Sequence, residues 1–338
     1  MPCPPKQHSD EYGFLSLVGQ NRLKEKLVYL LSVGIPGHAY AFTGADGMGK
    51  RSFARLFAAQ WLCTDEYLQP CGKCLSCRTF EAGTNPDVVL IQTKERQIRI
   101  ESIRDLQEAF STRASYGKKL CIIEEAEKMN ESAQNCLLKT LEEPPKNTLL
   151  LLTTSGYDSL QTTIRSRVSK LPMDGYSEKE LRTISKKQTG LEPSPFLIAF
   201  SQGNPGRMIT LQKSETLDIN RKMVLGLVDT KPHLLEATGA ESLWKYLSAN
   251  KEQFQECIGL LQGLLRDLLS IHENVDNMLI NSDKTDTIRV TAKRRTREYW
   301  IAAIEKTDDI QSSMMDSLNY QIAVDMLNTV LEPLFGIG

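Results

Sequence analysis

The sequence predicts an α/β fold, in which helices cover both faces of a parallel sheet, followed by two helical domains. Residues 37–60 have the pattern of a strand, a glycine-rich turn and an amphipathic helix, which is typical of a phosphate-binding loop. Strand and helix patterns then alternate up to residue 172, and such alternation indicates a parallel sheet. Beyond residue 216 the only strand-like run is residues 287–291, so the C-terminal third is predicted to be helical.

The phosphate-binding loop follows an apolar run, residues 39–43, that predicts a buried strand. Gly44, Gly49 and Lys50 fit the pattern G-x-x-x-x-G-K, and Gly47 adds a further glycine inside it. Such glycines let backbone N–H groups converge on a phosphate at the start of a helix. Lys50 is expected to lie against the β- and γ-phosphates of a nucleotide.

The residue after the lysine departs from this pattern. The motif requires Ser or Thr there, because that hydroxyl ligates Mg²⁺, and the chain has Arg51 instead. A cation repels a metal ion, so the binding of ATP and Mg²⁺ in this site is doubtful and turnover is not expected. The alternative is that Ser52 supplies the hydroxyl after a shift of the loop by one residue.

Four of the eight cysteines, Cys63, Cys71, Cys74 and Cys77, lie close together after the helix of the loop. Clustered cysteines in a chain without a secretory signal indicate metal binding rather than disulfides. Four thiolates complete a tetrahedral zinc shell, and no open position remains for catalysis. We therefore expect a structural Zn²⁺, with redox cysteines or an iron–sulfur cluster as the alternatives.

The next elements bring acidic and polar residues to strand ends. Residues 87–92 predict a strand, residues 101–111 a helix, and residues 120–123 a strand that ends in Glu124 and Glu125. A P-loop domain places its metal-orienting and water-activating carboxylates there, usually Asp followed by Glu. Two solvated acids after a buried strand are the alternative.

The predicted core ends with three more elements. Residues 132–143 form an amphipathic helix that Pro144 and Pro145 stop, and residues 149–154 form a strand. Thr154 at its end either senses a γ-phosphate or merely ends the strand. Residues 169–171 are the last strand.

The remaining chain reads as helical. Short helices at residues 178–188 and 196–201, and one opened by the GNPGR segment at 203–207, predict a small domain. Apolar stripes then predict a bundle, with the stripes formed by Phe254, Ile258, Leu261, Leu265, Leu268 and Ile271, and by Trp300, Ile304, Ile322, Val324, Leu327 and Leu331. The basic residues 293–297 are interpreted as a solvated helix start, with a DNA contact as the alternative.

Composition limits the partners and the location. The chain has 338 residues, enough for two or three domains, and its net charge of −1 does not support tight autonomous binding of nucleic acid. No apolar run reaches the roughly 20 residues that cross a bilayer, and the first residues do not resemble a secretory signal. We expect a cytoplasmic protein with no membrane partner.

Six features occur in one order across residues 18–172: the phosphate loop, the four-cysteine insert, EEAEKMN, LLKTLEEPP, LLLTTS and RSRV. This stretch resembles the AAA+ domain of the sliding-clamp loader family of bacterial DNA polymerase III, most closely its subunits with a damaged phosphate loop. The resemblance implies an AAA+ P-loop NTPase core at 1–173 with an inserted zinc module at 63–77. It also implies a helical lid at 174–213 and an all-α collar for oligomerisation at 214–338.

The resemblance implies roles for two arginines. RSRV matches the family's Ser-Arg-Cys motif, with Val168 in place of the cysteine, and the matching residue is Arg167. Arg167 is implied to enter a neighbouring subunit's ATP site as an arginine finger. Arg207 matches the lid arginine that senses phosphate in active relatives, a role that is doubtful beside Arg51 and Glu124.

The implied partners are the gamma/tau and delta subunits of the clamp loader, with the sliding clamp and primed DNA reached through the assembly. The function implied is that of a largely non-hydrolysing ring member. The alternatives are an ATP-hydrolysing motor of the gamma/tau type and a zinc-dependent nucleic-acid-binding protein.

Overall fold

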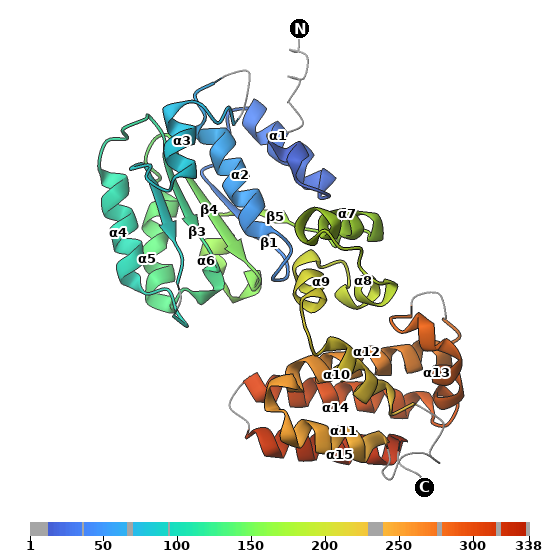
Figure 1. The fold of residues 1–338 in the computed structure, drawn as a ribbon. Coiled ribbons are helices and arrows are strands. Elements are labelled where there is room, and N and C mark those ends of the chain that lie inside the picture. Colours follow the sequence, from blue (N-terminus) through green and yellow to red (C-terminus); the bar gives the residue numbers. More distant parts are fainter. Residues whose placement is uncertain are drawn as a thin grey trace. The chain divides into compact units, whose positions relative to one another are not determined.

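The computed structural model describes residues 13–35, 37–65, 70–93, 95–228, 239–275, 279–315 and 319–335 (Figure 1). The chain divides into two units, one of Met1–Gly190 with Gly203–Arg207 and one of Leu191–Gln202 with Met208–Gly338. The boundaries of the three predicted domains stay a prediction. Among the described residues, no helix is both long enough and apolar enough to cross a membrane.

The first unit contains a five-stranded sheet in the order β2-β3-β4-β1-β5, and all four strand pairs are parallel. The strands are β1 (Ala39–Thr43), β2 (Val88–Ile91), β3 (Lys119–Ile123), β4 (Thr148–Thr154) and β5 (Ser169–Pro172). Thr43 pairs with Thr154, so β1 and β4 end at the same edge of the sheet. Since parallel strands share this edge, the segments that follow them meet there.

Helices cover both faces of this sheet, as predicted (Figure 1). The helical segments of the first unit are η1 (Phe14–Ser16), α1 (Asn21–Ser32), α2 (Lys50–Leu62), α3 (Leu75–Glu81), α4 (Ile100–Ser111), η2 (Ala126–Lys128), α5 (Glu131–Glu142), η3 (Tyr157–Ser159), α6 (Thr162–Arg165) and α7 (Glu178–Thr189). Strand β1 shows how the faces differ. Ala39 and Ala41 share a core with α4 and α5, whereas the rings of Tyr40 and Phe42 contact Phe57 of α2.

The second unit is helical among its described residues, as the sequence predicted. Its elements are α8 (Pro195–Ser201), α10 (Leu217–Leu225), α11 (Gly239–Ala249), η5 (Lys251–Gln253), α12 (Phe254–His272), η7 (Ser282–Lys284), α13 (Thr285–Ala292), α14 (Arg297–Met315) and α15 (Tyr320–Phe335), while α9 (Pro205–Gln212) belongs to both units. The predicted stripe of α12 is buried in the core of this bundle. Trp300 of α14 is also fully buried and donates its indole N–H to the carbonyl of Ala292 at 3.2 Å.

Two sequence-based expectations were wrong in detail. The strand-like run at 287–291 lies in α13, where Ile288, Thr291 and Ala292 are buried at helical spacing, so tertiary packing overrides β-propensity. Ile322 was expected in a buried stripe, but it is 51% exposed. Between η1 and α1 the backbone has positive φ angles at Gly19 and Gln20, which interrupt the helical conformation.

Candidate nucleotide site, cysteine cluster and Arg167

The phosphate loop connects β1 to α2, as the sequence predicted. Gly44, Gly47 and Gly49 have φ angles of 151°, 84° and 92°. Residues other than glycine rarely adopt this region of backbone conformation. Gly49 is the N-cap of α2, so Lys50 and Arg51 are the first two residues of this helix. The loop therefore has the conformation that its glycines predict.

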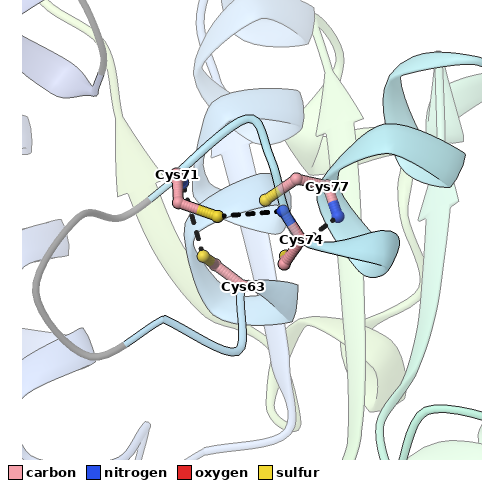
Figure 2. A group of neighbouring side chains, drawn as sticks. All are labelled: Cys63, Cys71, Cys74 and Cys77. Carbon is pink, nitrogen blue, oxygen red and sulfur yellow. Dashed lines mark hydrogen bonds between the residues drawn. The ribbon is translucent and has the colours of Figure 1, made fainter.

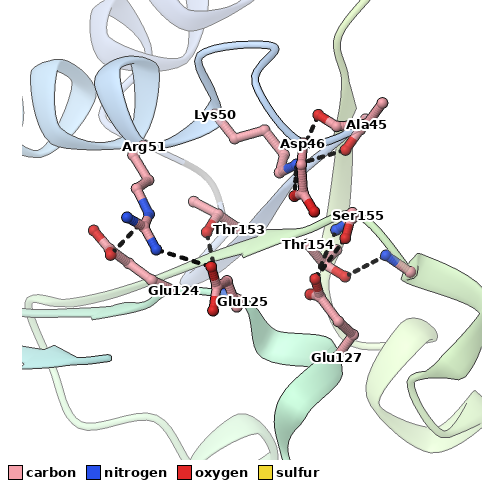
Figure 3. Close-up of polar contacts among 12 residues, drawn as sticks. Ala45, Asp46, Lys50, Arg51, Glu124, Glu125, Glu127, Thr153, Thr154 and Ser155 are labelled. Atoms are coloured by element: carbon pink, nitrogen blue, oxygen red, sulfur yellow. Dashed lines mark hydrogen bonds and ion pairs between the residues drawn. The ribbon is translucent and has the colours of Figure 1, made fainter. Parts of the chain in front are cut away.

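Lys50 is buried and turns back onto its own loop (Figure 3). Its ammonium donates to the carbonyls of Gly44 and Ala45 at 2.6 and 2.9 Å, and it pairs with the Asp46 carboxylate at 3.2 Å. All three N–H groups of a lysine can be used by such contacts. Lys50 thus has a complete set of acceptors within the chain.

The GNPGR segment lies directly against the phosphate loop. Asn204 donates its side-chain Nδ2 to the carbonyl of Asp46 at 2.6 Å, and the Gly206 N–H donates to the carbonyl of Gly47 at 3.0 Å. The two backbones are so close that a Cβ on Gly206 would be 2.5 Å from the Cα of Gly47. Glycine is therefore required at this crossing. Arg207 follows directly and donates its backbone N–H to Asn204 Oδ1 at 3.0 Å.

Tyr176 completes the contacts of the loop. Its hydroxyl donates to the carbonyl of Met48 at 3.1 Å, and its ring lies beside Gly19. Burial raises the pKa of Tyr176 to about 12, so the hydroxyl stays protonated and remains a donor. Every carbonyl from Gly44 to Met48 therefore accepts a hydrogen bond from the chain itself.

Arg51 joins the two acidic residues that follow β3 (Figure 3). Its Nε lies 2.9 Å from Glu124 Oε2, and its Nη2 lies 3.0 Å from Glu125 Oε1. The Glu124 side chain is only 3% exposed, whereas that of Arg51 is 55% exposed. Since a buried carboxylate needs a partner, the Arg51 guanidinium stabilises the charge of Glu124.

Neighbouring polar groups are also engaged. Glu125 accepts from Lys128 at 2.5 Å, and its backbone N–H donates to Thr153 Oγ1 at 3.3 Å. Thr154, for which the sequence left both a γ-phosphate sensor and a simple strand end open, is fully buried, and its Oγ1 accepts from the Gly156 N–H at 3.2 Å. The sheet edge thus brings the predicted acids and hydroxyls to the phosphate loop.

The four clustered cysteines converge between the end of α2 and the start of α3 (Figure 2). Their sulfur atoms all lie within 4.8 Å of one another. Backbone N–H groups of Cys71, Cys74 and Cys77 donate to the sulfurs of Cys63, Cys71 and Cys74 at 3.3–3.4 Å. Such N–H donors stabilise negative charge on sulfur.

These sulfurs fit a tetrahedral metal site. A Zn–S distance of about 2.3 Å places tetrahedral sulfurs about 3.8 Å apart, which a small contraction of the cluster gives. Burial would by itself raise the pKa of Cys74, but hydrogen bonds from Thr64 and Cys77 outweigh it and lower that pKa to about 6. Burial and the neighbouring Cys74 raise the pKa of Cys77. A cation among the sulfurs would favour the thiolate form of all four.

Arg167 lies just beyond α6 and is held by residues of its own unit. Its Nη2 is 2.9 Å from Glu142 Oε1 at the end of α5, and its Nη1 donates to the carbonyl of Thr163 at 3.0 Å and to Ser166 Oγ at 3.3 Å. Its side chain is 37% exposed. The guanidinium is therefore held by three contacts and remains partly accessible.

Sequence reasoning missed several of these contacts. Nothing in the sequence indicated that Tyr176 contacts the phosphate loop, since an isolated tyrosine after a strand is common. Asn204 and Gly206 lie in a segment that the sequence marks only as the start of a helix and as the position of Arg207. Their contacts with the phosphate loop join residues far apart in the chain, and no local pattern reports such a pairing.

The parallel sheet, the loop after β1 and the acidic pair after β3 define the class: the first unit has the AAA+ form of the P-loop fold. Residues 19–176 match the family model "DNA polymerase III, delta subunit", and residues 235–330 match "DNA polymerase III, delta subunit, C terminal". The chain belongs to the delta prime family of DNA polymerase III subunits. The predicted resemblance is confirmed.

Relatives with known names agree with this assignment. The delta prime subunit of Bacillus subtilis is 29% identical over 92% of this chain and 97% of its own length. That of Pseudomonas aeruginosa is 32% identical over 58% and 64%, and the tau subunit of Escherichia coli is 36% identical over 50% and 26%. Among solved structures, a gamma-subunit-related protein of Thermotoga maritima aligns with 91% of this chain and 99% of its own at a TM-score of 0.45 and 17% identity, too distant to indicate function.

Proposed function

We propose that this chain is a clamp-loader subunit that does not hydrolyse ATP and instead supplies Arg167 to the ATP site of a neighbouring subunit. One observation carries the first half of this proposal. Arg51 stands where a Mg²⁺-binding hydroxyl is needed and bridges Glu124 and Glu125 at 2.9 and 3.0 Å. A metal ion would have to displace a permanently charged guanidinium from both carboxylates.

The contacts of the phosphate loop also support the proposal that this chain does not hydrolyse ATP. Lys50, which would have to contact the β- and γ-phosphates, is bound to the loop carbonyls of Gly44 and Ala45. The GNPGR segment also contacts the loop, through Asn204 and Gly206. Nucleotide binding would therefore require Lys50 to leave the carbonyls of Gly44 and Ala45.

The partners follow from the family. Relatives of this chain include the delta prime, tau and gamma subunits of DNA polymerase III. We propose assembly with gamma/tau and delta subunits, in a ring that places the sliding clamp on primed DNA with the use of ATP. The net charge of −1 suits a subunit whose contact with DNA is made by the whole assembly.

Arg167 would act in trans by charge stabilisation. A guanidinium that reaches the transferred phosphoryl group from a neighbouring protein offsets the charge developed there, and arginine fingers accelerate hydrolysis by about 10³–10⁵-fold. Arg167 is ordered, partly exposed and outside the helices that cover the sheet. These properties suit a side chain that is offered to another subunit.

The cysteine cluster would bind one structural Zn²⁺ through Cys63, Cys71, Cys74 and Cys77. The cluster offers four sulfurs and no position for a substrate, so the ion would stabilise the fold rather than take part in a reaction. Iron–sulfur clusters use the same ligand set, and metal analysis of the purified protein distinguishes the two.

Hydrolysis by the purified chain tests the first half of the proposal. We expect no ATP turnover above that of the Lys50→Ala variant, measured as released phosphate with Mg²⁺ present. A rate that Lys50→Ala abolishes would instead support the gamma/tau-type motor, which the similarity to tau subunits favours. In that case Ser52, which is exposed in the first turn of α2, is the residue to replace next.

The assembled complex tests the second half. Arg167→Ala should leave the mass of the complex unchanged and lower its ATP turnover by at least about 10³-fold at the neighbouring site. Arg165→Ala is the matched control, since Arg165 lies two residues away and pairs with Asp158 at 2.8 Å. Unchanged turnover with Arg167→Ala would exclude the finger role.

A further inference from the structure

The motif LLKTLEEPP ends in two adjacent glutamates with different surroundings. Glu142 is the last residue of α5, Glu143 is its C-cap, and both side chains are exposed. Glu142 Oε1 lies 2.9 Å from Arg167 Nη2. The two glutamates therefore differ in whether they contact the proposed finger, and this difference allows a matched comparison.

The position of Glu142 on α5 is unfavourable by itself. The C-terminal end of a helix carries partial negative charge, so a carboxylate in the last turn is destabilising there. The Arg167 guanidinium offsets both the carboxylate and the helix end. The end of α5 is consequently a binding site for a cation, and Arg167 occupies it.

Arg167 is also held from its other side. Its Nη1 donates to the carbonyl of Thr163 at 3.0 Å and to Ser166 Oγ at 3.3 Å. A guanidinium has five N–H donors in a fixed plane, and a carboxylate and a phosphate compete for the same pair of them. A finger that is paired with Glu142 must therefore lose this partner before it binds a phosphoryl group through the same nitrogen.

We propose that Glu142 is a positioning residue, which holds the Arg167 guanidinium at the end of α5 until a neighbour's nucleotide competes for it. The proposal rests on the proposed function, because it assumes that Arg167 acts in trans. Arg167 then acts as a finger by exchanging the Glu142 carboxylate of this chain for a phosphate of the nucleotide in the neighbouring chain. While Arg167 is paired with Glu142, ATP turnover by the assembly is low.

The size of the effect follows from the exposure of the pair. Arg167 is 37% and Glu142 is 51% exposed, and an exposed ion pair shifts an equilibrium by up to about five-fold. Removal of the Glu142 charge should therefore raise the fraction of Arg167 that is available by about two- to five-fold. The increase should be in kcat and not in KM, because the finger acts on the transition state.

The test uses the assembled clamp loader, with ATP turnover measured in the absence of clamp and primed DNA. Glu142→Gln should raise kcat by about two- to five-fold with KM for ATP unchanged. Glu143→Gln, the matched control, should leave kcat and KM unchanged. Glu142→Asp keeps the charge, so its kcat should stay closer to that of the original chain than the kcat of Glu142→Gln does. An unchanged or lowered kcat for Glu142→Gln would overturn the proposal.

A double variant separates this proposal from the proposed function. Arg167→Ala with Glu142→Gln should show no increase over Arg167→Ala alone, because the released side chain is missing. An increase that persists without Arg167 would assign the effect to the helix end and overturn the proposal. If Arg167→Ala alone leaves turnover unchanged, the finger role itself is wrong, whereas a loss with Arg167→Ala and no response to Glu142→Gln contradicts only the role of Glu142.

Discussion

At residue 51 a single side chain decides the charge balance of the sheet edge. Glu124 is almost completely buried, and a carboxylate in such a place is stable only when a cation or several donors face it. Arg51 faces it from α2 and extends to Glu125 as well. The chain therefore carries its own counterion where a motor subunit would bind a metal.

Arg51→Ala should lower the free energy of unfolding by about 1–3 kcal/mol, because it leaves the Glu124 carboxylate without its cation. Urea unfolding measures this loss, and millimolar Mg²⁺ should restore part of it in the variant but not in the original chain. Arg55→Ala, one turn further along α2 and exposed, should change stability by less than about 0.5 kcal/mol. Equal effects of the two variants would show that the bridge to Glu124 is unimportant.

Gly206→Ala tests the contact between the GNPGR segment and the phosphate loop. The new Cβ would lie 2.5 Å from Gly47 Cα, so one backbone must move, and the chain should lose about 1–3 kcal/mol of stability. Hydrogen exchange should also become faster at residues 44–50. Gly226→Ala, at a helical φ of −57°, is the control for the loss of a glycine. Unchanged exchange in the loop would contradict the importance of this crossing.

Among the elements, α12 supports the loop in front of α13 through one buried carboxylate. Asp267 accepts from the backbone N–H groups of Ile280 and Asn281 and from the Asn281 side chain, each at 2.8 Å. It is only 2% exposed. This carboxylate satisfies backbone donors that would otherwise be buried without a partner.

Asp267→Ala should therefore lower the free energy of unfolding by about 2–4 kcal/mol. Burial raises the pKa of Asp267 in the folded chain above its ordinary value, so its protonated form favours folding more than its ionised form. The loss of unfolding free energy caused by Asp267→Ala should accordingly be larger at pH values below the pKa of Asp267 in the unfolded chain. It should become smaller as pH rises through the higher pKa of Asp267 in the folded chain. Asp309→Ala, on the exposed side of α14, is the control. A deficit that grows with rising pH would contradict this account.

The cysteine cluster joins α2 to α3, and metal removal should weaken this connection. Replacement of Cys71 and Cys74 together by serine should release about one zinc ion per chain and lower the midpoint of thermal unfolding. Cys136→Ser, on α5 and outside the cluster, should keep the metal. Metal content is measured by elemental analysis, and a chain that contains no metal as purified would refute the zinc proposal.

For the whole molecule, assembly should not depend on nucleotide in this subunit. We expect the chain to form a complex of the same mass with motor and delta subunits in the presence and absence of ATP, because Lys50 and Arg51 already have partners within the chain. The Lys50→Ala chain should behave in the same way. A complex that forms only with ATP and is lost with Lys50→Ala would show that this site binds nucleotide.

The sequence predicted those parts of the molecule that local patterns determine. The strands of the sheet and the helices around them follow apolar runs bounded by glycine and proline, and the cysteine spacing predicted the cluster. The contact of Gly206 with Gly47 and the pairing of Glu142 with Arg167 could not be predicted, because they depend on how distant segments pack. Residues 287–291 show the converse: their β-branched composition favours a strand, and the bundle core makes them a helix.

The row of satisfied carbonyls from Gly44 to Met48 has a consequence for the cell. These hydrogen bonds are made within the chain, so the loop keeps them when no nucleotide is present. Under the proposed function, a fall in ATP would thus leave this subunit folded while the hydrolysing subunits stop. No refolding of this subunit would then be needed when ATP returns.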